Sequence, residues 1–79
     1  MYLVRTKFPA GFRQGPGRHP YHQVGTVLSG TLYLGFGEQF DEQQVVRIPP
    51  GQTWTVPASR PYFLWAKEGD VLLQMMGNG

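Results

Sequence analysis

The sequence has 79 residues, a formal net charge of +2 and no cysteine. The absence of cysteine excludes a disulfide framework and a thiolate metal site. A chain this short forms a single domain, here residues 1–79, and buries only about 60–65% of the surface that its unfolded chain exposes. We therefore expect the small core to be completed by pairing with a second copy, as a homodimer.

Short runs rich in Val, Leu, Thr, Tyr, Phe and Trp alternate with Gly- and Pro-containing turns along the chain. This pattern is typical of many short strands in a sandwich or barrel, and no segment keeps a helical period. The sequence therefore predicts an all-β fold. The expected strands are residues 2–8, 24–28, 31–36, 44–48, 53–56, 62–67 and 71–76. We interpret Gly15-Pro16-Gly17, between the first two, as a turn.

The expected strand 62–67 is apolar on both of its faces. Phe63 and Trp65 alternate with Tyr62, Leu64 and Ala66. Successive side chains of a strand point to opposite faces, so this strand is buried on both sides. We interpret it as lying between the core and a partner, which favours the homodimer.

Two stretches of the chain have a characteristic spacing of glycine, proline and histidine. Residues 11–30, GFRQGPGRHPYHQVGTVLSG, fit the spacing G-x5-H-x-H-x3-4-E-x6-G, with Gly11, His19 and Gly30 in register. Residues 51–66, GQTWTVPASRPYFLWA, fit G-x5-P-x-G-x2-H-x3-N, with Gly51 and Pro57 in register. The pair resembles the two motifs of the cupins. This resemblance implies a double-stranded β-helix, that is, a jelly roll or small β-barrel.

The resemblance also implies where a metal would be bound. In cupins two histidines, a glutamate and a further histidine bind one divalent metal inside the barrel. The matching positions of this chain are Gly17, His19, Gln23 and Tyr62. Glycine has no side chain, glutamine offers only a neutral amide oxygen, and tyrosine is un-ionised at neutral pH. The resemblance therefore implies a cupin scaffold with a degenerate metal site.

His22 is a further candidate ligand. On a regular strand it would face away from Gln23, but Pro20 interrupts the ladder and allows an irregular path. The candidate metal ligands are thus His19, His22, Gln23 and Tyr62, for a divalent metal or for ferric iron, which favours a tyrosinate. Because a tightly held metal needs three or four good ligands, we expect no cofactor and keep the metal as an alternative.

No catalytic residue can be assigned, because the serines and the acids fall at expected turns and no activated pair is visible. Trp54 and Tyr62, with His19 and Gln23, are expected to line the barrel mouth and to bind a small polar or aromatic ligand. Such rings equally fill a core or a dimer seam. The sequence favours a small-molecule-binding or sensing module. A metal-dependent dioxygenase or isomerase with a reduced ligand set is the alternative.

The charges of the chain are unevenly distributed. Residues 1–37 carry Arg5, Lys7, Arg13 and Arg18 and no acid, whereas residues 38–79 carry all five acids. A basic half interleaved with aromatic rings can attract single-stranded nucleic acid, which is the second alternative. Spaced charges are more often a solvated face, and the helix of an OB-fold is missing, so we do not expect nucleic-acid binding.

The amino terminus lacks the apolar region of a signal peptide, and no stretch approaches about 18 consecutive apolar residues. We therefore expect a soluble, cytoplasmic protein that does not enter a membrane.

Overall fold

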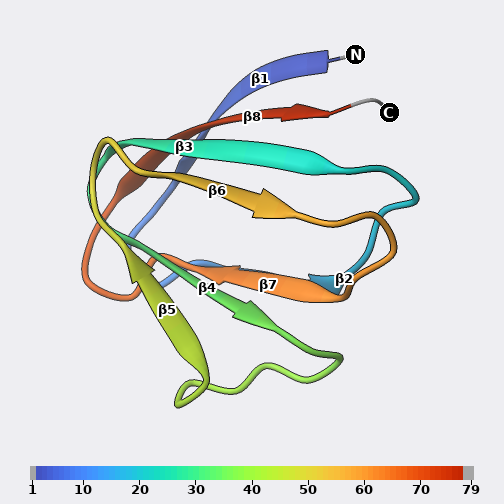
Figure 1. Cartoon of the computed structure of the whole chain (residues 1–79). Helices are drawn as coiled ribbons and strands as arrows, with labels where there is room; N and C mark the ends of the chain where they lie inside the picture. The colour runs from blue at the N-terminus through green and yellow to red at the C-terminus, as the bar shows by residue number, and fades with distance from the viewer. Residues whose placement is uncertain (1, 78–79) are drawn as a thin grey trace.

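The structure is a computed structural model, and it describes residues 2–77 of the chain. In this range the chain forms eight strands and no helix, so it contains no helix that could span a membrane. The strands are β1 (Tyr2–Phe8), β2 (Arg13–Gly17), β3 (Gln23–Ser29), β4 (Leu32–Phe36), β5 (Val45–Ile48), β6 (Thr53–Val56), β7 (Tyr62–Trp65) and β8 (Val71–Gly77). They build two antiparallel four-stranded sheets, in the orders β1-β8-β3-β6 and β2-β7-β4-β5 (Figure 1). The predicted all-β fold is confirmed.

All seven expected strands are present, with ends that differ by no more than two residues from the expected ones. The chain forms β2 where we expected a turn, and that interpretation was wrong. β2 pairs with β7 through an irregular register between Gln14 and Gly17. Gly15 has a φ of +86°, and a Cβ there would lie 2.8 Å from the Tyr62 carbonyl oxygen. A bulged edge strand tolerates Gly and Pro. Because these residues are also typical of turns, the sequence pattern of β2 indicated a turn.

The core lies between the two sheets, as the period of two along the strands predicts. Val27 and Leu73 from one sheet and Leu32 and Leu64 from the other are fully buried. The whole buried cluster comprises Phe8, Val27, Leu32, Leu34, Ile48, Trp54, Val56, Tyr62, Leu64, Ala66, Val71, Leu73 and Met75. Tyr62 and Leu64 belong to this inner cluster, and Phe63 and Trp65 do not.

The outer face of β7 is covered by the chain itself. The loop between β4 and β5 places the Phe40 ring 4.5 Å from the Phe63 ring and 5.4 Å from the Trp65 ring. The Arg13 guanidinium stacks 4.2 Å from Phe40 and 4.9 Å from Trp65. Glu42 of the same loop accepts a hydrogen bond from Arg13. The two apolar faces of β7 therefore do not require a second copy, and the homodimer stays a prediction that needs other support.

The fold brings the acids of the second half to the cations of the first half. Within residues 2–77 three exposed ion pairs form, Lys7 with Asp70 at 3.5 Å, Arg13 with Glu42 at 2.7 Å and Arg18 with Glu38 at 2.5 Å. Arg5 Nε donates to Gln74 Oε1 at 3.2 Å. Such pairs contribute little to stability, but they place a negative charge beside each of three cations. The local positive field that a nucleic-acid backbone requires is weakened accordingly.

Candidate functional site

The candidate site lies at one end of the sandwich, which we call the barrel mouth. β3 and β7 begin at this end, whereas β2, β6 and β8 end there (Figure 1). The strand register aligns Gln23 with Val56 on one side and with Gly77 on the other. On the facing sheet Gly17 is aligned with Tyr62. The two stretches that carry the cupin spacing therefore meet at the barrel mouth.

Gln23 is the central polar residue of the barrel mouth. Its side chain is 4% exposed, the one buried side chain of polar, non-aromatic type in residues 2–77. Gln23 Nε2 donates to the Tyr2 hydroxyl at 2.7 Å, whereas Oε1 is buried and has no hydrogen-bond partner in this range. An unpaired buried acceptor costs about 1–3 kcal/mol. Gln23 Oε1 is therefore a buried acceptor whose hydrogen-bonding capacity is unused.

A series of aromatic rings in mutual contact begins at Tyr2, which is bonded to Gln23. The rings of His19 and Tyr21 stack with centroids 5.2 Å apart and an interplanar angle of 23°. Tyr21 contacts Tyr2 edge to face at 5.8 Å, and His19 contacts Tyr62 at 6.0 Å. Tyr2, His19 and Tyr21 are half-buried and cover the fully buried Gln23 and Tyr62. The result is a polar amide beneath an aromatic cover.

The loop between β6 and β7 holds the segment that carries both histidines. The backbone N–H of Ser59 donates to the His19 carbonyl at 2.6 Å. The backbone N–H of Ala58 donates to His22 Nδ1 at 3.0 Å. His22 is exposed and is bonded to this loop, so the structure separates it from Gln23. Of the two histidines, His19 contacts the barrel mouth.

The phenols of the barrel mouth are held in their neutral form. Burial raises the pKa of Tyr62, and the nearby Tyr2 adds to the rise, although the neighbouring Gln23 amide opposes it. The neighbouring Tyr2 hydroxyl raises the pKa of Tyr21. Because tyrosine ordinarily titrates near pH 10, both phenols are un-ionised at neutral pH. They act as neutral hydrogen-bond donors and acceptors.

Trp54 lies deeper, on the inner face of β6. It is 6% exposed and is aligned with Gly25 of β3. A Cβ at residue 25 would overlap the indole ring, so the missing side chain of Gly25 makes room for Trp54. Trp54 Nε1 is buried without a hydrogen-bond partner in residues 2–77. The four predicted ligand-binding residues thus occupy the same end of the interior, with Trp54 below the others.

These side chains do not fit a tightly held metal ion. Gly17 offers no ligand, and Gln23 offers one neutral amide oxygen, which is a weak ligand. His22 is bonded to the neighbouring loop, which leaves His19 as the one imidazole in contact with the mouth. Residues 2–77 contain no cluster of three or more His, Cys, Asp or Glu that could hold a metal. A metal site needs three or four good ligands, and this donor set provides one.

The structure adds two residues to the site that the sequence reasoning missed. Tyr21 lies between the two histidines, and its ring chemistry could have suggested a role beside His19. Tyr2 belongs to the first strand and lies outside both motifs, so no spacing pattern predicts a role for it. Sheet topology alone brings it to Gln23.

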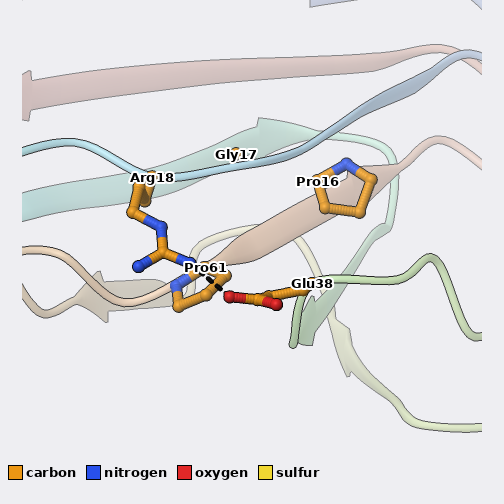
Figure 2. Close-up of a pocket in the computed structure, with 5 residues that line it drawn as sticks. All are labelled: Pro16, Gly17, Arg18, Glu38 and Pro61. Carbon is orange, nitrogen blue, oxygen red and sulfur yellow. Dashed lines mark hydrogen bonds and ion pairs between the residues drawn. The ribbon is translucent and has the colours of Figure 1, made fainter.

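A second hollow of about 240 Å³ lies on the outside of the molecule (Figure 2). It is lined by Pro16, Gly17, Arg18, Glu38 and Pro61. Figure 2 shows the Arg18 guanidinium directed at the Glu38 carboxylate beside Pro61. The two side chains are 53% and 75% exposed and neutralise each other. This hollow therefore offers no unpaired buried group, and the barrel mouth is the stronger candidate.

No protein-family profile matches the sequence, and no curated protein sequence matches it. Solved structures do match. A structure of oxalate oxidase is similar over 98% of this chain and 41% of its own, with a TM-score of 0.79 and 21% identity. A cupin superfamily protein from Desulfitobacterium hafniense matches over 94% and 63%, with a TM-score of 0.77 and 17% identity. The DMSP lyase DddQ from Ruegeria pomeroyi matches over 98% and 37%, with a TM-score of 0.81 and 17% identity.

The chain spans less than two thirds of each of these proteins. At such identities the likeness concerns the fold. The two antiparallel sheets and the match to solved cupins confirm the cupin fold that the two motifs imply.

Proposed function

We propose that this cupin-fold chain is a binding or sensing module for a small molecule, which it holds in the barrel mouth. The observation that carries the proposal is the buried and unpaired Oε1 of Gln23. Native proteins pair nearly all buried polar atoms, and exceptions point to a bound partner or a functional role. A ligand that donates to this oxygen would remove the cost of the unpaired group.

The proposed site has two layers. Gln23, Trp54 and Tyr62 form the buried layer and supply hydrogen-bonding groups. His19 belongs to the half-buried cover, together with Tyr2 and Tyr21, and offers ring faces for stacking. The cover comes from the start of β1 and from the segment between β2 and β3. Strand ends and loops move more easily than strand interiors, so the cover is the part that would open for a ligand.

A thermal-shift screen of small neutral, acidic and basic compounds tests this proposal. A ligand present at 100 times its Kd stabilises a protein by about 2.7 kcal/mol, which gives a clear rise in Tm. The same compounds are then tested on Gln23→Leu, whose fold is checked by circular dichroism. Hits that stabilise both proteins equally would show that the barrel mouth is not the site.

A metal-dependent enzyme is the second candidate. The similarity to oxalate oxidase and to a DMSP lyase favours it, because structures of this fold can perform catalysis. The donor set of the barrel mouth argues against it, since His19 is the one imidazole there. Elemental mass spectrometry on untagged protein separates the two candidates. About one metal per chain after loading with iron, zinc or manganese would favour the enzyme.

We also propose that the chain forms a homodimer and works in the cytoplasm. Support for the dimer comes from β1, which is one of the two edge strands of its sheet. Leu3 and Val4 of β1 are 60% and 45% exposed. An edge strand with exposed apolar side chains on both faces is a favourable place for another strand to pair.

A further inference from the structure

Two buried side-chain atoms in residues 2–77 lack a hydrogen-bond partner, and they are of opposite kinds. Gln23 Oε1 is an acceptor, whereas Trp54 Nε1 is a donor. Both side chains point to the inner face of the β3–β6 pair, where Gln23 is aligned with Val56 and Gly25 with Trp54. The barrel interior therefore presents one free acceptor and one free donor from adjoining strands.

The two atoms belong to neighbouring positions of the inner face. The Trp54 ring covers Gly25, and its atom Cε2, which is bonded to Nε1, is among those that a Cβ on residue 25 would meet. Gly25 and Gln23 are successive inner-face positions, roughly 6.5–7 Å apart along a strand. Two hydrogen bonds that share one oxygen span up to about 6 Å. For one oxygen to bond to both atoms, the Gln23 side chain has to supply the remaining reach while its Nε2 stays bonded to Tyr2.

We infer that the barrel mouth takes an uncharged ring compound whose hydroxyl accepts from Trp54 Nε1 and donates to Gln23 Oε1. This inference rests on the proposed binding function and names its ligand class. A hydroxyl both donates and accepts. A carboxylate has no donor and would place its negative charge against the Gln23 oxygen. An ammonium group has no acceptor for the indole N–H.

The surroundings of the site agree with an uncharged ligand. The residues that shift the pKa of Tyr62 are Tyr2, Tyr21 and Gln23, and none of these three carries a charge at neutral pH. The nearby cations are engaged elsewhere. Arg18 is paired with Glu38, and Arg60 stacks on the Phe36 ring with its guanidinium carbon 3.9 Å from the centroid. A charged head group would thus lose its hydration without gaining an opposite charge.

Three probes that share a benzyl or phenyl ring test the inference. They are benzyl alcohol, benzoate and benzylamine, which carry a hydroxyl, an anion and a cation at neutral pH. The full chain is titrated with each probe, and the indole N–H signals of its two tryptophans are followed by NMR. We expect benzyl alcohol to shift the Trp54 signal and to bind about tenfold more tightly than either charged probe, because each charged group loses a hydrogen bond.

Trp65 provides the matched control, because it lies on the outer face of β7 against Phe40 and Arg13. Its indole signal should not shift, and Trp65→Phe both assigns the signals and leaves binding unchanged. Trp54→Phe keeps a ring and removes the N–H, so benzyl alcohol should bind several-fold more weakly to it. The comparison of the three probes on the unaltered chain needs no variant and stands even if Trp54→Phe does not fold.

The outcomes separate this inference from the proposed function. Equal or tighter binding of benzoate or benzylamine, with a shift at Trp54, would overturn the neutral ligand class and leave the binding module in place. If none of the three probes shifts the Trp54 indole or the Gln23 amide signals, both proposals fall, and the two unpaired atoms serve only bound water.

Discussion

Tyr2 and Gln23 are hydrogen-bonded to each other across an intervening strand. The Gln23 amide donates to the Tyr2 hydroxyl at 2.7 Å, although β8 lies between β1 and β3. Gly77 of β8 is aligned with both residues. A Cβ at residue 77 would lie 2.9 Å from Cε2 of Tyr2 and 3.0 Å from its hydroxyl. The absence of a side chain at residue 77 therefore lets Tyr2 reach Gln23.

The first prediction concerns this contact. Gly77→Ala should displace the Tyr2 ring and break its bond to Gln23, because the neighbouring His22 carbonyl, 3.1 Å from the new Cβ, limits the alternatives. We expect a loss of about 1–3 kcal/mol in the free energy of unfolding. Urea denaturation measures it. The control is Gly69→Ala, where a Cβ meets nothing within 4 Å and the change should be small. Equal stability of the two variants would show that the Tyr2 contact does not matter.

The second prediction concerns the cover of the outer face. Phe40→Ala removes the ring that shields Phe63 and Trp65, which are now 1% and 8% exposed. It should lower the free energy of unfolding by about 1–3 kcal/mol and shift the fluorescence of Trp65 to the red. Val46→Ala is the control, because Val46 is already 62% exposed and should tolerate the change. An unchanged spectrum in Phe40→Ala would mean that the loop does not shield this face in solution.

The third prediction restores a metal site. Gly17→His, Gln23→Glu and Tyr62→His together should create strong binding of nickel, iron or zinc, since they complete the ligand set beside His19. A Cβ at residue 17 meets open space, so this strand end can accept a side chain. The binding is measured by isothermal titration calorimetry, and the variant without Gly17→His serves as the weaker-binding control. A folded triple variant that binds no metal would show that these positions do not share one pocket.

The fourth prediction is the oligomeric state. Light scattering at micromolar concentration should give the mass of a dimer, because the exposed edge of β1 favours strand pairing between copies. Leu3→Lys places a charge on this edge and should shift the mass toward that of a monomer. The matched control is Leu28→Lys, at another exposed leucine of the same sheet but not on the edge strand. A monomer mass for the unaltered chain would contradict the prediction.

Part of the site could be predicted from the sequence. His19, Gln23 and Tyr62 were predicted from motif spacing, and Trp54 from its expected position on the inner face. In the structure His19 contacts Tyr62, and Gln23 and Trp54 lie on the inner face of the β3–β6 pair. His22 was offered as a metal ligand, but its Nδ1 accepts from Ala58. The direction of the His22 side chain could not be predicted from the sequence. Pro20 interrupts the strand, and with it the regular alternation that decides on which face a side chain lies.

The strands and their inner faces follow from the amino-acid order, since a period of two and the turn chemistry of Gly and Pro are local properties of the chain. The cover of the second apolar face of β7 depends instead on how distant segments pack. The alternation of Phe63 and Trp65 predicts an interface with a partner, whereas in the structure Phe40 and Arg13 lie over these two side chains. Tyr2 likewise reaches Gln23 because the sheet order places β1 one strand away from β3, and because Gly77 of the intervening β8 has no side chain. Contacts of this kind depend on which strands become neighbours. The hydrophobic alternation within one strand specifies its inner face but not its neighbouring strands.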